Sequence, residues 1–268
     1  MRCFVAFLKI ELRSIGLYRA DFLLKLLYGL IAMYGVRCLW GTLYAQNPAM
    51  VGRPLPSMIT YAMLAAALDI IFYPPALSTV PQNYIAQQVR VGRIDTDLLR
   101  PMGLQRQLFS RNAANAVFGA LCLVLPAWFI AVLLLGMQLP PSITSGVCFL
   151  FSGALGFVIL FSLNFLLGML CFVTVNIRQI TMTYSGILTL LSGKLIPNWM
   201  YPGWMQAVIS VLPFRCIFEI PLNIYTGAVT SLGALQGLLL QCAWAASLLV
   251  LGRLMWGCVH RHLAVQGG

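Results

Sequence analysis

Hydrophobic residues along this chain gather into six long runs, separated by short segments that contain charged residues, prolines and glycines. A helix needs about 20 apolar residues to cross the hydrocarbon core of a bilayer, which is roughly 30 Å thick. Each run is a candidate for such a helix, because a helix satisfies its own backbone hydrogen bonds in lipid. The pattern predicts six membrane-spanning helices, at residues 22–44, 58–77, 113–135, 144–173, 179–196 and 234–256.

The composition indicates that almost the whole chain is embedded in a membrane. Of its 268 residues, 60% are hydrophobic and only 9% are charged, whereas about a quarter of the residues of a soluble domain are charged. The net charge of +11 is also found in nucleic-acid-binding proteins, but here the basic residues are sparse and lie between apolar runs. We therefore predict one all-α membrane domain over residues 1–268, with no separate soluble domain and no nucleic-acid partner.

The basic residues predict the orientation, because Lys and Arg are retained on the cytoplasmic side of a membrane. If the N-terminus is cytoplasmic, twelve basic residues fall in inner segments and only Arg53, Lys194 and Arg215 fall in outer loops. A seventh span through residues 207–227 would place Arg215 and Glu219 in lipid, so we exclude it. The prediction is a multi-pass protein of the cell (inner) membrane with both termini in the cytoplasm.

The first 20 residues predict a helix that lies on the membrane surface. Lys9, Glu11 and Arg13 interrupt what would have to be the apolar core of a cleaved signal peptide. Apolar residues at helical spacing between Phe4 and Ile15 form one face instead, which is typical of an interfacial helix. A cytosolic lead-in without contact to lipid is the alternative.

The longest inner segment, residues 81–112, predicts two short helical pieces with defined ends. Pro81 suits the first turn of a helix, and Gly92 suits the left-handed conformation that ends one. Asp95 then caps a second turn, which begins at residues 98–99 and ends at Pro101. These signals indicate a compact structure on the membrane surface.

Two functions are consistent with residues 81–112. In one, Arg90, Arg93 and Arg100 contact lipid phosphates, as basic residues of inner loops commonly do. In the other, the same arginines surround an apolar tip formed by residues 98–99, and the segment is a docking surface for a cytoplasmic protein. We favour docking, because a plain loop needs no helix cap, glycine stop and proline stop so close together.

The outer segment before the last span predicts short helices broken by proline. Its apolar pieces are too short to cross the bilayer, and its Trp and Tyr residues are of the kind that settle at membrane interfaces. We expect residues 197–230 to lie in the outer leaflet, where they either shape an exit for apolar or amphipathic molecules or anchor the ends of the spans. The candidate residues of this outer gate are Pro197, Pro202, Pro213, Phe214 and Pro221.

Asp69 is the clearest polar residue inside a predicted span, where an unpaired charge costs roughly 2.5 to 3.5 kcal/mol. We expect it to be protonated, paired or facing a cavity, and Arg37 in the first span is a candidate partner. A structural ion pair and a contact to the transported molecule both remain open. Milder polar residues form interhelical hydrogen bonds of about 0.6 kcal/mol or line the pathway with Asp69. They are Asn164, Asn176, Thr181 and Tyr184.

The chain lacks the motifs of an enzyme or a metal site. It has no G-x-x-x-x-G-K-[ST] phosphate loop, no H-E-x-x-H pair and no G-x-S-x-G turn. Its eight cysteines are scattered with no C-x-x-C pair, and its six acidic residues offer little for hydrolysis or proton relay. We predict that the chain is not an enzyme, binds no cofactor or metal itself, and takes its energy from another protein.

Four pieces of the sequence carry a likeness to a known family. They are YRADF at residues 18–22, RVGRIDTDLLRP at residues 90–101, LPF at residues 212–214, and Pro221 with Gly227. Together, and in this order, they resemble the membrane subunits of ATP-binding cassette (ABC) transporters of the type-2, exporter-like class. The second piece is fairly specific, whereas Asp69 and the break at Pro74 and Pro75 do not map onto the family pattern.

The resemblance implies that residues 82–101 form the coupling helix, which sits in a groove of a cytoplasmic ABC ATPase that holds ATP and Mg²⁺. It also implies that two permeases, either two copies or this chain and a sister permease, form one pathway. The N-terminal interfacial helix and the broken outer helices fit the same class. The implied coupling residues are Arg90, Gly92, Arg93, Ile94, Asp95, Leu98, Leu99, Arg100 and Pro101.

We therefore expect a permease subunit for ATP-driven export that forms half of a translocation pathway. The alternative is an ion-coupled secondary transporter with Asp69 as its coupling carboxylate. That alternative predicts an inverted repeat, which we do not find in the sequence. A membrane-embedded enzyme comes third, because the sequence lacks a catalytic cluster.

Overall fold

The computed structural model describes residues 19–46, 52–73, 80–92, 103–172, 174 and 177–266. Of these residues, 85% are in helices and none is in a strand, so the predicted all-α class is confirmed for the described part of the chain. The α-helices are α2 (Arg19–Gln46), α3 (Leu55–Phe72), α4 (Pro81–Val91), α6 (Leu104–Phe118), α7 (Leu125–Leu134), α8 (Ile143–Met169), α9 (Ile177–Leu191), α10 (Gly203–Val211), α11 (Glu219–Tyr225) and α12 (Ser231–Gln266). A π-helical turn, η3 (Gly119–Val124), joins α6 to α7, and the 3₁₀ turns are η4 (Leu170–Phe172), η5 (Asn198–Met200) and η6 (Pro213–Cys216).

Five helical stretches of the described residues are long and apolar enough to cross a membrane. They are Leu23–Gln46, Leu55–Phe72, Leu104–Leu134, Ile143–Phe172 and Ser231–Val259. The span expected at residues 179–196 corresponds to α9, which has 15 residues and is therefore about 22 Å long. Gly193, with φ of 78°, follows its end. The predicted count of six spans is thus not confirmed.

Proline explains where two of the helices depart from the predicted spans. The second span was expected to reach residue 77, but α3 ends at Phe72, where the amide of Tyr73 donates to the Asp69 carbonyl over 2.8 Å. Pro74 follows at once, and a proline disfavours the helical conformation of the residue before it. In the third span, Pro126 lies at the start of α7, directly after the π-turn η3. A helix that contains proline loses one backbone hydrogen bond, and a π-turn is one way to accommodate this.

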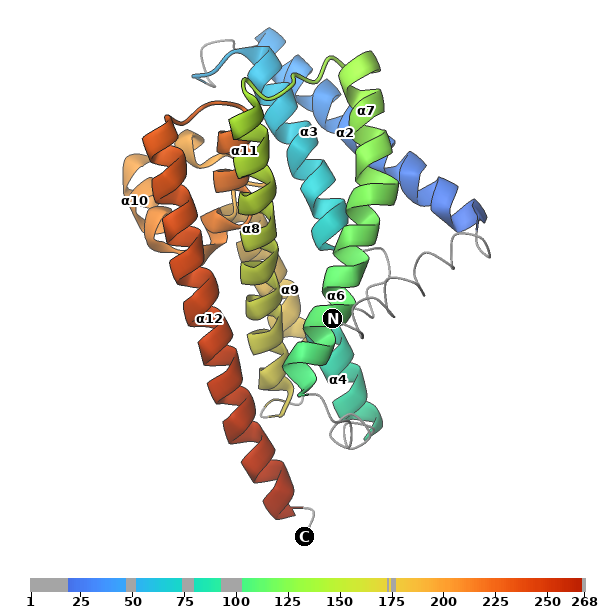
Figure 1. The fold of residues 1–268 in the computed structure, drawn as a ribbon, viewed down its shortest axis with the longest axis vertical. Helices are drawn as coiled ribbons and strands as arrows, with labels where there is room; N and C mark the ends of the chain where they lie inside the picture. Colours follow the sequence, from blue (N-terminus) through green and yellow to red (C-terminus); the bar gives the residue numbers. More distant parts are fainter. Residues whose placement is uncertain are drawn as a thin grey trace.

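Helix α8 is the central element of the bundle (Figure 1), and it packs against α12, α11 and α4. We call the end of the bundle with α4 and the C-terminal part of α12 the lower end. The opposite end, which carries the connection between α7 and α8, is the upper end. Helix α2 crosses α3 obliquely near the upper end (Figure 1), and α10 lies in the upper half, where it contacts η5 and η6.

The apolar core has two parts. The larger part joins α2, α3, α7, α8, α11 and α12, with Tyr61, Met63 and Phe218 almost fully buried. The smaller part lies at the lower end and ties α4 and α6 to α8. Its buried members are Ile85, Leu104, Leu108, Phe161, Phe165 and Met169.

Two glycines let the neighbours of α8 approach it closely. A Cβ atom on Gly156 would lie 2.7 Å from the carbonyl oxygen of Ile217, between η6 and α11. A Cβ atom on Gly168 would lie 2.7 Å from Cδ1 of Ile85 on α4. A real Cβ atom does not come so close to another heavy atom. The contact with the backbone carbonyl of Ile217 therefore requires glycine at position 156, whereas a Cβ atom at position 168 would force the end of the Ile85 side chain to shift.

Gln241 of α12 binds two neighbouring elements inside the bundle. The hydroxyl of Ser152 on α8 donates to its Oε1 over 2.8 Å. Its Nε2 donates to the carbonyl oxygens of Ser152, over 3.1 Å, and of Cys216, over 2.7 Å. A buried carboxamide is costly unless it is hydrogen-bonded, so this arrangement fixes α8, η6 and α12 in register.

The outside of the bundle is largely apolar. Exposed side chains include Leu134 of α7, Leu150 of α8 and Leu254 of α12, at 75%, 68% and 63% exposure. Exposed apolar surface of this extent fits contact with lipid chains better than contact with water. The apolar helices therefore fit a multi-pass membrane protein, whereas the predicted interfacial helix at residues 1–20 lies outside the described residues except for Arg19 and Ala20, which begin α2.

Gly156→Ala should destabilise the bundle, because the added methyl group meets backbone carbonyls that cannot move as a side chain can. We expect a loss of about 1–3 kcal/mol, measured by thermal unfolding of the purified protein in detergent. The matched control is Gly153→Ala on the same helix, whose Cβ would meet only Cδ2 of Leu68 at 4.0 Å. Equal losses for the two variants would contradict the close contact at Gly156.

Candidate functional site

Helix α4 begins and ends where the sequence predicts. Pro81 occupies its first turn, and Gly92 follows its last residue with φ of 66°. The amide of Gly92 donates back to the carbonyls of Gln88 and Val89, which satisfies orphan carbonyls at the helix end. Arg90 lies in the last turn, where a positive charge is favoured by the helix dipole.

One face of α4 is fixed to the bundle and the other is free of it. Ile85 is fully buried and Gln82 nearly so, both against Gly168 of α8. Arg90 and Val91 are exposed at the tip. The remaining predicted coupling residues, which are Arg93, Ile94, Asp95, Leu98, Leu99, Arg100 and Pro101, lie outside the described residues.

Asp69 forms an ion pair, but with a different partner from the one expected. Its Oδ1 lies 2.6 Å from Nζ of Lys194, and both side chains are about a quarter exposed. The expectation that Arg37 is the partner is therefore wrong. Asp69 is in the last turn of α3, where it faces the segment after α9, whereas Arg37 lies beside the first two turns of α3.

Three polar residues gather beside this ion pair, one from the end of α3 and the others from α8 and α9. Tyr73 interacts with the charge of Asp69 and with the side chain of Asn164 on α8, and Tyr184 of α9 interacts with Tyr73. We call Asp69, Lys194, Tyr73, Asn164 and Tyr184 the Asp69 cluster. The structure thus brings together three of the predicted pathway residues. Thr181 is partly buried on α9, and Asn176 lies outside the described residues.

A tight turn at residues 192–194 joins this cluster to a second one. The hydroxyl of Tyr61 donates to the carbonyl of Gly193 over 2.7 Å, and the amide of Glu219 donates to the carbonyl of Ser192 over 3.2 Å. A Cβ atom on Gly193 would lie 2.9 Å from Cβ of Glu219. With positive φ and this contact, position 193 requires glycine.

The second cluster, the Glu219 cluster, consists of Arg53, Trp199, Arg215, Glu219 and Asn223. The guanidinium of Arg53 lies 3.4 Å from the centre of the Trp199 ring and donates to Oδ1 of Asn223 over 3.0 Å. Glu219 is 6% exposed, and its Oε2 lies 4.0 Å from Nε of Arg215. Burial raises the pKa of the Glu219 carboxyl, and the charges of Arg215 and Arg53 oppose that rise.

Sequence reasoning missed the Glu219 cluster. The spacing of Arg215 and Glu219, one helical turn apart, is a signal for their contact. No local signal links Arg53 to Trp199, because the two residues come from connections far apart in the chain. The cluster ties the start of α3 to the broken helices.

The broken helices after α9 follow the prolines. Pro197 precedes η5, Pro202 precedes α10, Pro213 begins η6, and Pro221 lies in the first turn of α11. Phe214 packs against the main core. Each proline is at or near a helix start, where its missing amide proton costs little. The predicted breaks are confirmed, and the gate role of these residues stays a prediction.

A comparison with protein families decides what kind of protein this is. A family model described as ABC-2 family transporter protein matches residues 30–267, which is most of the chain. The chain belongs to this family. No curated protein and no solved structure matches it significantly. The resemblance to permeases of type-2 ABC transporters is thereby confirmed.

Membership gives the class of the protein. An ABC-2 permease is a membrane transport component, and the family implies that it works in a membrane with an ABC ATPase. Within the described ranges, no group of three or more His, Cys, Asp or Glu side chains has the arrangement of a metal site. The two polar clusters of this ABC-2 permease join α3 to the segments that follow α9.

The Asp69–Lys194 pair can be tested with a double-mutant cycle. Asp69→Asn and Lys194→Met each leave one charge unpaired among apolar helices, so the double variant should lose less stability than the sum of the two. We expect a coupling of about 1 kcal/mol, or about 3 °C in the midpoint of thermal unfolding.

The control cycle combines Asp69→Asn with Arg37→Gln. These two changes should be additive within about 0.5 kcal/mol, because the side chains have no shared partner. Coupling in the control cycle but not in the first would restore Arg37 as the partner of Asp69.

Proposed function

We propose that this chain is the membrane-spanning permease subunit of an ATP-driven ABC export system. It docks a separate cytoplasmic ATPase and forms half of the translocation pathway with a second permease, either a copy of itself or a sister chain. The observation that carries the proposal is α4, a short helix with a fixed face on α8 and an exposed tip at Arg90 and Val91, in a chain of the ABC-2 family.

The ATPase docks at the tip of α4 and at the predicted coupling residues that follow it in the sequence, up to Pro101. Supporting this, the tip lies at the lower end of the bundle (Figure 1), and the inner segments predicted from the basic residues include Arg90 and Arg106. In this orientation the permease lies in the inner membrane with both termini in the cytoplasm. ATP and Mg²⁺ are held by the partner, since this chain has no phosphate loop.

Movement passes from α4 to the upper half of the bundle through α8. The contact of Gly168 with Ile85 is at the lower end of this helix, and the contact of Gly156 with the carbonyl of Ile217 is more than three turns away. A helix this tightly packed moves as a unit, because packed interiors deform little. A tilt of α4 would then shift the broken helices that contain Pro213, Phe214 and Pro221.

The pathway runs between the two permeases along α9. The amphipathic sequence of α9 presents Thr181 and Tyr184 among its polar residues, and this helix makes the sixth, short crossing. The Asp69 cluster lies on one side of this route, and the residues predicted as the outer gate, from Pro197 to Pro221, close it at the upper end. Export is the direction that the exporter-like class implies.

The ion-coupled alternative is not favoured. Asp69 is held by Lys194 at 2.6 Å, so a coupling ion would have to displace an ammonium group that the chain itself supplies. The family match also points to ATP as the energy source.

Photo-cross-linking tests the docking surface directly. Val91→p-benzoyl-phenylalanine at the tip of α4 should capture a soluble protein in intact membranes. The captured protein should carry a G-x-x-x-x-G-K-[ST] phosphate loop and hydrolyse ATP, as identified by mass spectrometry and by activity of the purified complex.

The matched control is Val208→p-benzoyl-phenylalanine on α10. Val91 and Val208 are both 55% exposed, and they lie in opposite halves of the bundle (Figure 1). The control should capture no ATPase. Capture of an ATPase from position 208, or its absence at position 91 in membranes that contain the assembled transporter, would contradict the proposed docking surface.

A further inference from the structure

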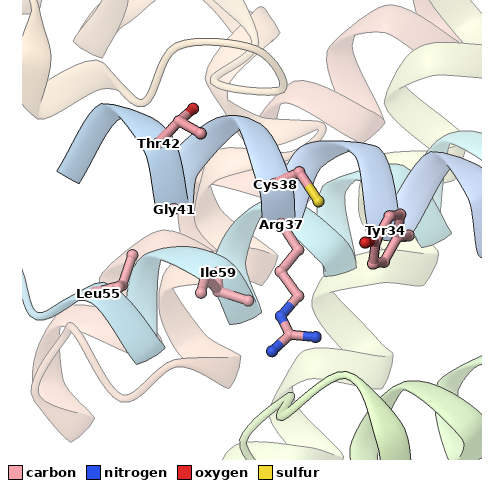
Figure 2. Close-up of a pocket in the computed structure, with 7 residues that line it drawn as sticks. All are labelled: Tyr34, Arg37, Cys38, Gly41, Thr42, Leu55 and Ile59. Carbon is pink, nitrogen blue, oxygen red and sulfur yellow. The ribbon is translucent and has the colours of Figure 1, made fainter. Parts of the chain in front are cut away.

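A groove lies between α2 and α3, and none of its lining residues belongs to the two polar clusters (Figure 2). Its volume is about 490 Å³, and it is lined by Tyr34, Arg37, Cys38, Gly41, Thr42, Leu55 and Ile59. The α2 residues recur at helical spacing and form one stripe along the helix. Leu55 and Ile59 of α3 supply an apolar wall, and the guanidinium of Arg37 extends away from α2 beside Ile59 (Figure 2). We call it the Arg37 groove.

The charge of Arg37 has no acidic partner in the described part of the chain. The whole protein has six acidic residues, and of these Asp69 and Glu219 face other basic side chains. Asp21 is on α2 itself, roughly 24 Å away along the helix. The other three acids lie outside the described residues. An arginine in a membrane-spanning helix costs free energy unless an anion compensates it, so the groove is complementary to an external anion.

The position of the groove along the membrane normal indicates which anion binds there. Helix α3 begins at Leu55, and Ile59 is one turn further, about 6 Å along the helix. Arg37 therefore lies near the boundary between the hydrocarbon core and the headgroup layer, where a long basic side chain can reach phosphate groups. Lipid phosphates are the most abundant anions at this depth.

We propose that the Arg37 groove binds the phosphate headgroup of an anionic phospholipid from the leaflet at the upper end. Arg37 pairs with the phosphate, the hydroxyl of Tyr34 is placed to hydrogen-bond to the headgroup, and one acyl chain lies against Leu55 and Ile59. The groove is open to the side, so the lipid enters from the bilayer. A volume of about 490 Å³ is in the range of small-molecule sites.

Native mass spectrometry of the purified, delipidated permease tests the proposal. Palmitoyl-oleoyl phosphatidylglycerol should bind at one saturable site, and phosphatidylcholine with the same chains should bind more weakly. Arg37→Gln should weaken phosphatidylglycerol binding about tenfold, the effect of losing one charge-assisted hydrogen bond. Arg37→Lys, which keeps the charge, should retain part of the affinity.

A second pair of variants separates the groove from a general attraction of lipid to basic residues. Gly41 lines the groove and Gly35 does not, and a Cβ atom at either position would meet nothing within 4 Å. Gly41→Leu should therefore fill the groove and reduce binding with the fold intact, whereas Gly35→Leu should leave binding unchanged. Arg253→Gln, which removes an exposed arginine of α12, should also leave it unchanged.

Three results would overturn the proposal. If Arg37→Gln and Arg253→Gln weakened phosphatidylglycerol binding equally, binding would depend only on the total charge of the protein. If glycerol 3-phosphate, which has no acyl chains, displaced the lipid, the apolar wall would not contribute to binding. A change from dimer to monomer in Arg37→Gln, without a change in lipid binding, would show that a second permease supplies the anion.

Discussion

The close packing of α8 is the constraint on which the rest of this structure depends. Glycine at position 168 brings α4 against the lower end of this helix, and glycine at position 156 brings the carbonyl of Ile217 against it further up. Gln241 fixes α12 to the same region through Ser152. The contact at Gly156 leaves no room for a side chain, so α8 holds α4 at its lower end and the broken helices near its middle as one rigid element.

Charged residues of the bundle form contacts between helices that are held together by α8. Two of the six acidic residues, Asp69 and Glu219, lie in clusters that join α3 to the chain after α9. In surroundings of low dielectric constant such contacts are strong, and they are costly when one partner is lost. They are therefore suited to hold one arrangement of the helices. Arg37 stands apart from both clusters and faces the groove between α2 and α3.

The sequence predicted those features that depend on local chemistry. The ends of α4 follow from Pro81 and Gly92, and the broken helices follow from prolines such as Pro213, because each of these residues restricts its own backbone. The partner of Asp69 and the contact of Arg53 with Trp199 depend on tertiary packing, which no local pattern encodes. Pro74 is a local signal for the early end of α3, but the run of apolar residues continues past it and led to a predicted span that is too long.

The central claim is that the tip of α4 faces the cytoplasm, where ATP is available. Cysteine labelling in intact cells tests it most directly, in a background without the eight native cysteines. Val229→Cys, in the connection between α11 and α12, should react with a membrane-impermeant maleimide, and Val91→Cys should react only after the cells are permeabilised; both valines are exposed. Labelling of position 91 in intact cells would contradict the account.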